Sequence, residues 1–371
     1  MSKYDYKNDI VGSFLRPEVL KTARKNFEEG KIQKEELTRI EDECVKDLIA
    51  KQKEVGIHVI TDGEFRRSTW HLDFMWGFEG VDHCKTTTGL PFNDEVALVD
   101  DTYIVGKVAL NGEHPFIEHF KFVQSFEDEN TVAKQTIPSP AQVLAQFTMP
   151  FNRLKTKHFY ENNQDLIDDL VAAFNKFVND LYDAGCRILQ LDDCTWGMLS
   201  DFSAATRIYN TDANGLKAIQ ETYKDINNRV IDAAPKDLEI NTHICRGNYH
   251  STFACSGAYD PVADVLFGGE NVNKYYLEFD DDRSGGFESL SKISGDKKVV
   301  LGLITTKFPE LEDKETVKER IRLATKYIPL ERLSLSPQCG FASCEIGNKL
   351  TEEEQWDKLR LVKEIADEVW G

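Results

Sequence analysis

The chain has 371 residues and carries 45 Lys and Arg against 64 Asp and Glu, which gives a net charge of −19 at pH 7. This charge argues against a nucleic-acid-binding protein, because an acidic surface repels phosphate and no dense Lys/Arg cluster offsets it. The apolar share of 41% is typical of a globular protein and excludes a disordered one. No apolar run approaches the ~18 residues of a membrane span, and the first residues lack the pattern of a signal peptide. We therefore expect a cytoplasmic protein with no membrane partner, whose eight cysteines are thiols or metal ligands.

Short β-branched or apolar segments alternate with longer amphipathic segments along the chain. The predicted strands, in chain order, are residues 9–14, 57–62, 132–137, 187–192, 238–243, 274–279, 298–304 and 333–336. The predicted helices are residues 35–55, 163–184, 215–233, 261–267, 314–327 and 352–369. Thr351 ahead of Glu354 has the spacing of a capping box, which predicts the start of the last helix.

Eight predicted strands with helices between them match the count of a (β/α)8 TIM barrel, although a doubly wound sheet gives a similar alternation. No Gly/Ser/Pro-rich linker divides the chain, so we expect one α/β TIM-barrel domain over residues 1–371 rather than two smaller domains. Residues 85–129 interrupt the alternation with Gly and Pro turns, an alternating stretch at 102–110 and no helical period. We predict that they form a β-hairpin insertion after the second strand.

Residue types that bind zinc gather at the ends of three predicted strands. In an extended segment residues i and i+2 point the same way, so His243 and Cys245 can direct an imidazole and a thiolate at one point. Glu278 stands near the end of the sixth strand and Cys339 follows the eighth, and these strands lie close to the fifth around a barrel. Zinc accepts this ligand mixture and usually takes four ligands, so we predict a Zn2+ site. A half-buried histidine beside core cysteines is the structural alternative, and Cys255, in a loop, is a weaker ligand candidate.

Zinc with two thiolate ligands carries little net positive charge, so it suits activation of a bound thiol better than hydrolysis. The carboxylates of Glu64 and Asp192, at the ends of the second and fourth strands, would face the same opening of the predicted barrel. There they would suit an ammonium group. Ser13 and nearby backbone N–H groups suit a carboxylate. An amino acid with a thiol describes homocysteine. The structural alternatives are an ion pair of Glu64 with Arg66 or Arg67, and a strand-end cap for Asp192.

Five short motifs follow one another in the chain: Val11-Gly12-Ser13-Phe14, Asp62-Gly63-Glu64-Phe65-Arg66-Arg67, Gln190-Leu191-Asp192, Thr242-His243-Ile244-Cys245 and Ser336-Pro337-Gln338-Cys339-Gly340-Phe341. In order and spacing they resemble the catalytic half of cobalamin-independent methionine synthase, above all its single-barrel bacterial relatives that are similar to 5-methyltetrahydropteroyltriglutamate–homocysteine methyltransferase. The resemblance implies a TIM barrel in which zinc is held by His243, Cys245, Glu278 and Cys339. It implies homocysteine binding by Gly12, Ser13, Glu64 and Asp192. In the family, the homocysteine thiolate attacks a methyl group on the donor.

The chain also departs from this family. We expect no second, amino-terminal barrel of the kind that helps the full synthase bind polyglutamyl folate, because 371 residues leave no room for it. Lys307 stands in place of the family's catalytic histidine, and would need a lowered pKa to assist proton transfer to a leaving folate nitrogen. The folate-stacking tryptophan has no clear counterpart in residues 137–140, and Met198 falls where the family has an acidic folate contact. Aromatic residues that could form a pocket for a pterin, corrin or sulfonium donor are Trp70, His71, Phe74, Trp76, Phe78 and Trp196.

The leading prediction is a zinc-dependent methyltransferase that converts homocysteine to methionine, with a methyltetrahydrofolate as one candidate donor. One alternative is a related zinc-dependent alkyltransferase or lyase that uses another thiol, although Glu64 and Asp192 favour an amino-acid thiol over a sulfonate. The second alternative is a barrel that binds zinc or an amino acid without catalysis. The sequence determines neither the methyl donor nor the oligomeric state, and a homo-oligomer is compatible with it.

Overall fold

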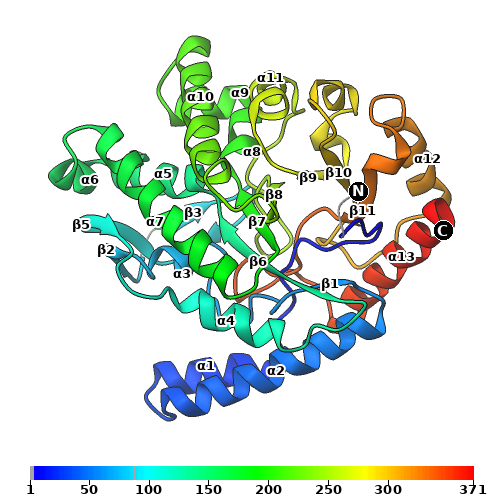
Figure 1. Ribbon diagram of the computed structural model, residues 1–371, viewed down its shortest axis with the longest axis horizontal. Helices are drawn as coiled ribbons and strands as arrows, with labels where there is room; N and C mark the ends of the chain where they lie inside the picture. Colours follow the sequence, from blue (N-terminus) through cyan, green and yellow to red (C-terminus); the bar gives the residue numbers. More distant parts are fainter. Residues whose placement is uncertain (1–3, 87–88) are drawn as a thin grey trace.

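Seven parallel strands form a curled central sheet in the computed structural model, which describes residues 4–86 and 89–371 (Figure 1). The sheet order follows the chain: β1 (Val59–Ile60), β6 (Val132–Pro138), β7 (Ile188–Asp193), β8 (Glu239–Ile244), β9 (Lys274–Glu278), β10 (Lys298–Ile304) and β11 (Leu333–Pro337). All neighbouring pairs are parallel, and nearly every residue of these strands is buried, as expected when helices cover a parallel sheet. The predicted α/β class with a TIM-barrel-like sheet is confirmed.

The first predicted strand is extended but is not assigned as a strand. It lies between β11 and β1, where the Asp9 amide donates to the Leu335 carbonyl (3.0 Å) and the Thr61 hydroxyl donates to the Gly12 carbonyl (2.7 Å). A single parallel bridge joins Asn8 to β11. Gly12 has φ +144, a backbone conformation that departs from a regular strand. The segment therefore occupies the eighth position of the curl without forming a full ladder (Figure 1).

The six predicted helices are confirmed to within three residues at each end: α2 (Lys34–Glu54), α7 (Asn163–Asp183), α10 (Ala213–Ile231), α11 (Asp260–Gly269), α12 (Lys314–Ala324) and α13 (Glu352–Trp370). The Thr351–Glu354 capping box is present at the start of α13. Shorter helices that the pattern did not predict are α1 (Glu18–Glu28), α3 (Leu72–Met75), α5 (Pro140–Thr148), α6 (Arg153–Phe159), α8 (Thr195–Ser200) and α9 (Phe202–Ile208). The long helices lie outside the curled sheet (Figure 1).

The predicted hairpin insertion is present after β1, but its first strand lies before residue 85, where we expected the insertion to begin. Its strands β2 (Glu79–Cys84) and β5 (Asp101–Ala109) pair antiparallel, and a smaller pair, β3 (Leu90–Pro91) and β4 (Val96–Ala97), lies between them in the chain. The expectation that residues 85–129 contain no helix is wrong, because α4 (Pro115–Gln124) follows the hairpin. His114 caps this helix, and its buried residues are Phe116, Ile117, Phe120 and Val123. These four buried residues at helical spacing are enough to stabilise the short helix, because it packs against β6 and α7.

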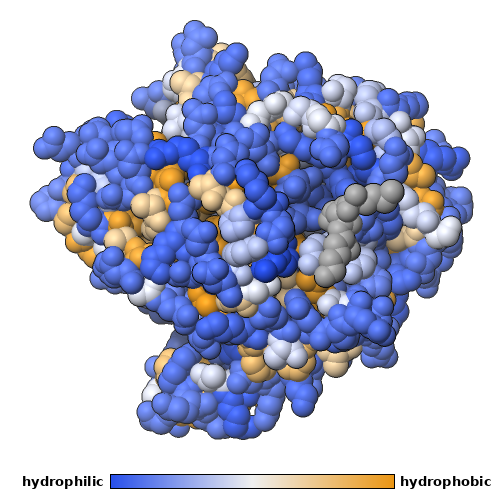
Figure 2. Space-filling model, viewed as in Figure 1, coloured by the Kyte–Doolittle hydropathy of each residue, from blue (hydrophilic) through white to orange (hydrophobic). Residues whose placement is uncertain are grey.

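The inside of the curl is charged where the amino ends of the strands meet. Asp9 accepts a hydrogen bond from the Tyr276 hydroxyl (2.6 Å) and lies 3.4 Å from Lys134 Nζ, and all three residues are buried. The outer surface is mostly hydrophilic, with hydrophobic residues in scattered patches on the face in Figure 2. In the part of the chain that the structure describes, no helix is both long and apolar enough to cross a bilayer.

Candidate active site

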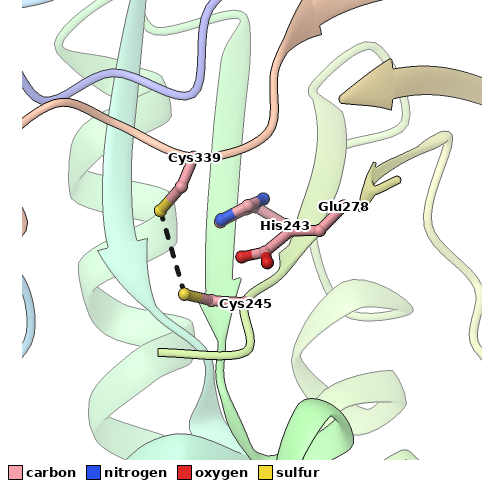
Figure 3. Close-up of side chains that lie close together, drawn as sticks. All are labelled: His243, Cys245, Glu278 and Cys339. Atoms are coloured by element: carbon pink, nitrogen blue, oxygen red, sulfur yellow. Dashed lines mark hydrogen bonds between the residues drawn. The ribbon is translucent and has the colours of Figure 1, made fainter. Parts of the chain in front are cut away.

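Four potential metal ligands converge at the carboxyl edge of the sheet. His243 is the penultimate residue of β8 and Cys245 follows that strand, Glu278 ends β9, and Cys339 follows β11. Their ligand atoms all lie within 4.8 Å of one another, and the two sulfur atoms are 3.8 Å apart. Figure 3 shows the imidazole, the carboxylate and both thiols directed into the same space. The four residues that the sequence grouped are therefore brought together.

All four side chains are buried, and several of their polar atoms have no partner within the described part of the chain. Both ring nitrogens of His243 and one carboxylate oxygen of Glu278 make no hydrogen bond. The other Glu278 oxygen accepts from the Arg246 amide (3.1 Å), and the Gly247 amide donates to Cys245 Sγ (3.3 Å). A buried polar atom without a partner is costly. One nitrogen, two sulfurs and one carboxylate form a ligand set that zinc accepts, so the residues present fit that ion.

The two thiols have strongly perturbed acidities. The neighbouring Cys194 thiol is the largest influence that raises the pKa of Cys245 well above its ordinary value, and burial adds to it. The Cys245 thiol and burial do the same to the pKa of Cys339. Two thiolates and a carboxylate in one buried cluster repel one another. A divalent cation at their centre would offset this repulsion and hold both cysteines as thiolates.

A cavity of about 500 Å³ lies over this cluster. His243, Cys245 and Cys339 line its floor, together with Ser13, Glu64 and Asp192 from the predicted substrate site. Asp192 and His243 are register partners on β7 and β8, which places them side by side. Gly12 and Glu278 are not among the lining residues within the described parts of the chain.

Glu64 sits in a strained turn. Its φ of +61 is in the left-handed region that non-glycine residues rarely adopt, and such strain is often found at functional sites. One carboxylate oxygen lies 3.3 Å from Arg67 Nη1 and accepts from the Thr136 hydroxyl (3.3 Å). The predicted ion pair with Arg67 is thus present, whereas Arg66 pairs with Glu41 and Asp42. Burial raises the pKa of Glu64 to about 7, and Arg67 opposes that rise.

Asp192 is held at the end of β7 by Gln190, whose amide donates to its carboxylate (2.7 Å). Burial raises the pKa of Asp192 to about 7, and the Gln190 hydrogen bond opposes that rise. A cation that enters between Asp192 and Glu64 would favour the charged form of both carboxylates. The next residue, Asp193, is not among the described residues that line the cavity, and its carboxylate accepts hydrogen bonds from the Ser139 and Thr195 hydroxyls.

Ser13 is fixed by the loop after β11. Its hydroxyl accepts from the Ala342 amide (3.3 Å). A side chain at Gly340 would clash with Ser13 Oγ, so the close approach of the two segments requires glycine there. This contact places Cys339 of the metal cluster beside the predicted substrate-binding turn.

Lys307 is 3% exposed and its Nζ lies 3.9 Å from Asp280 Oδ2. It is not among the described residues that line the cavity. Its catalytic role stays a prediction, one that the placement of the ammonium group does not favour.

The predicted aromatic run divides between the cavity and the core. Trp70 and His71 line the cavity, whereas Trp196 is fully buried and is not among the described lining residues. Phe74 and Phe78 pack on one another in the core. The sequence did not predict that the hairpin insertion contributes to the cavity wall, which includes Phe92, Val99, Asp100 and Asp101. The position of the insertion shortly after the Glu64 turn, with only the short helix α3 between them, is the signal that could have indicated this.

Comparison with known proteins places this chain in a family. The family model described as the catalytic domain of cobalamin-independent synthase matches residues 8–368. The uncharacterized protein YxjH of Bacillus subtilis is 42% identical over 371 residues, which cover 99% of this chain and 96% of that protein. The methionine synthase of Saccharolobus solfataricus is 24% identical over 337 residues, which cover 89% of this chain and 86% of that protein.

Two solved structures have the same fold. One is a protein of Listeria monocytogenes, provisionally assigned as a vitamin-B12-independent methionine synthase, with a TM-score of 0.76 and 37% identity over 99% of this chain and 98% of that one. The other is a B12-independent methionine synthase from Shewanella sp. W3-18-1 in complex with selenomethionine. Its TM-score is 0.72 at 20% identity, over 98% of this chain and 97% of that one.

The fold and the site define an α/β enzyme with a candidate metal cluster at the carboxyl edge of its sheet. The chain belongs to the cobalamin-independent methionine synthase family and is a methyltransferase of that family. The resemblance inferred from the five sequence motifs is confirmed.

Proposed function

We propose that this protein is a zinc-dependent methyltransferase that methylates homocysteine to methionine. The observation that carries the proposal is the buried cluster of one imidazole, two thiols and one carboxylate on the floor of the cavity. His243, Cys245, Glu278 and Cys339 would hold the zinc ion. Because two of these ligands are thiolates, a bound zinc ion keeps little positive charge and stabilises a substrate thiol as its thiolate rather than generating hydroxide.

The chain's own residues would orient the amino-acid end of homocysteine. Glu64 and Asp192 line the cavity beside the cluster, and their carboxylates suit the ammonium group. The hydroxyl of Ser13 and the backbone of the Gly12–Ser13 turn suit the carboxylate. With its amino-acid end fixed there, the thiol would reach the metal cluster and the rest of the cavity would hold the methyl donor.

We also propose that residues 1–371 act as one catalytic domain and that the protein works in the cytoplasm. The family match over residues 8–368 and the continuous curled sheet support the first statement. The eight cysteines, all without disulfide bonds, support the second, since thiols persist in a reducing compartment.

Calorimetric titration of homocysteine tests the proposal. We expect one homocysteine to bind per zinc-loaded chain, and homoserine, which has oxygen in place of sulfur, to bind about 100-fold more weakly, because the sulfur is the atom that meets the metal. Removal of zinc with a chelator should weaken homocysteine binding to the homoserine level. Equal affinities for the two amino acids in the zinc-loaded protein would contradict the proposal.

A further inference from the structure

The cavity outside the metal cluster is lined by carboxylate side chains but by no Lys or Arg in the described part of the chain. The carboxylates belong to Glu64, Asp100, Asp101 and Asp192. Arg67 lies behind Glu64, where it pairs with that carboxylate and donates to the Thr136 carbonyl. One oxygen of Glu64, a residue only 4% exposed, has no hydrogen-bond partner. A polyanionic donor would therefore meet repulsion along the wall, with no Lys or Arg among the described lining residues to bind its charges.

Part of the cavity wall is apolar and partly aromatic. Phe92 and Val99 of the insertion line it, together with Met149, Phe151 and Ile208 from the helical side. Asp100 and Asp101 follow Val99 in the chain and also line the cavity, and the Asp100 carboxylate pairs with His83 (2.8 Å). An apolar, aromatic surface with carboxylates beside it suits a cation whose charged atom carries only carbon substituents.

The described residues around the cavity also include no basic side chain placed to protonate a leaving nitrogen, and the carboxyl groups of Glu64 and Asp192, whose pKa burial raises to about 7, are assigned to the ammonium group of homocysteine. No lysine, arginine or tyrosine lines the cavity among the residues that the structure describes. His71 does line it, but burial lowers the pKa of His71 to about 3, so the imidazole is neutral near pH 7. A donor that leaves as an amine needs a proton in the transition state, whereas one that leaves as a neutral thioether does not.

We propose that the methyl donor of this enzyme is a small methylsulfonium cation, bound between Asp100, Asp101 and the apolar wall of the cavity. This inference rests on the proposed homocysteine methyltransferase function and identifies its second substrate. The homocysteine thiolate attacks the methyl carbon and forms a C–S bond. The bond from that carbon to the sulfonium sulfur breaks, and its electron pair stays on the departing sulfur. Both products are neutral at sulfur, so no proton, electron or further reactant is needed.

A donor comparison tests the proposal. Zinc-loaded protein is incubated with [13C]homocysteine and, separately, S-methylmethionine, 5-methyltetrahydrofolate triglutamate or methylcobalamin, and [13C]methionine is measured by mass spectrometry. We expect the sulfonium to support a kcat/KM at least about 100-fold above those of the other two donors, because the polyanion is repelled and neither rival carries its methyl group on a cationic sulfur. Faster turnover with the folate or with methylcobalamin would overturn the proposal.

A charge variant adds a readout of binding. In the Asp100→Asn/Asp101→Asn double variant we expect the Kd for S-methylmethionine, measured calorimetrically, to rise about tenfold while the Kd for homocysteine is unchanged. Asp296→Asn is the matched control, because this exposed carboxylate precedes β10 at the opposite edge of the sheet. An unchanged Kd for the sulfonium in the double variant would contradict the assigned site.

The two proposals fail in different ways. If homocysteine binds to the zinc-loaded protein but the sulfonium gives no [13C]methionine, the donor proposal is overturned and the thiol-binding function stands. If homocysteine itself does not bind, the proposed function fails and the donor proposal falls with it.

Discussion

The variants Cys339→Ser and His243→Ala are expected to lose most of their zinc. Each removes one of four ligand atoms that lie within 4.8 Å of one another, from a site where the polar atoms are buried and have few other partners. We expect zinc affinity to fall by at least about 100-fold, because the binding energy depends on the complete ligand set. Zinc content after dialysis, measured by plasma mass spectrometry, checks this result.

Cys255→Ser is the matched control for these variants. Cys255 lines the same cavity and is nearly as buried as Cys339, but it is outside the four-residue cluster. It should retain about one zinc ion per chain. Circular dichroism and the melting temperature would show that all three variants are folded. Full zinc retention by both ligand variants would show that the cluster is not the zinc site.

Asp192→Asn is expected to weaken homocysteine binding by roughly 10- to 100-fold without releasing zinc. The substitution keeps the shape of a buried side chain and its bond to Gln190, but removes the negative charge that would face the ammonium group. A hydrogen bond to a charged group contributes about 1.5–3 kcal/mol, which corresponds to this loss of affinity. Calorimetric titration and zinc analysis on the same preparation measure both quantities.

The same titration separates an amino-acid thiol from other thiols. With Glu64 and Asp192 beside the metal cluster, a thiol with a sulfonate in place of the amino acid should bind the wild-type protein far more weakly than homocysteine does. Asp296→Asn is again the control, and should leave homocysteine affinity unchanged. An Asp192→Asn protein that binds homocysteine as tightly as the wild type would refute the role assigned to this carboxylate.

The grouping of the candidate metal ligands could be predicted from the sequence because each lies at a strand end. His243 and Cys245 are two residues apart on an extended segment, and strands from distant parts of the chain must meet at one edge of a parallel sheet. Glu278 stands two residues beyond Tyr276, the register partner of His243, so it reaches the same edge. Short motifs at the ends of buried strands therefore carried most of the information about the site.

Other features depended on contacts that local patterns do not contain. The hairpin insertion lines the cavity through long-range packing, and its alternating sequence shows that it is a hairpin but not which surface it covers. Helix α4 is short and is capped by a histidine, which is not a usual start signal. The extended segment at Gly12 pairs too little to form a strand, because the chain turns there toward the Glu64 loop.

X-ray absorption at the zinc edge, with and without homocysteine, tests the central claim most directly. We predict about one zinc ion per chain, with a coordination shell of nitrogen, oxygen and two sulfur atoms that gains one sulfur neighbour when homocysteine is added. Such a gain would show that the metal cluster binds the substrate thiol. A protein without zinc, or a zinc shell that homocysteine leaves unchanged, would contradict thiol activation and favour a barrel that binds zinc or an amino acid without catalysis.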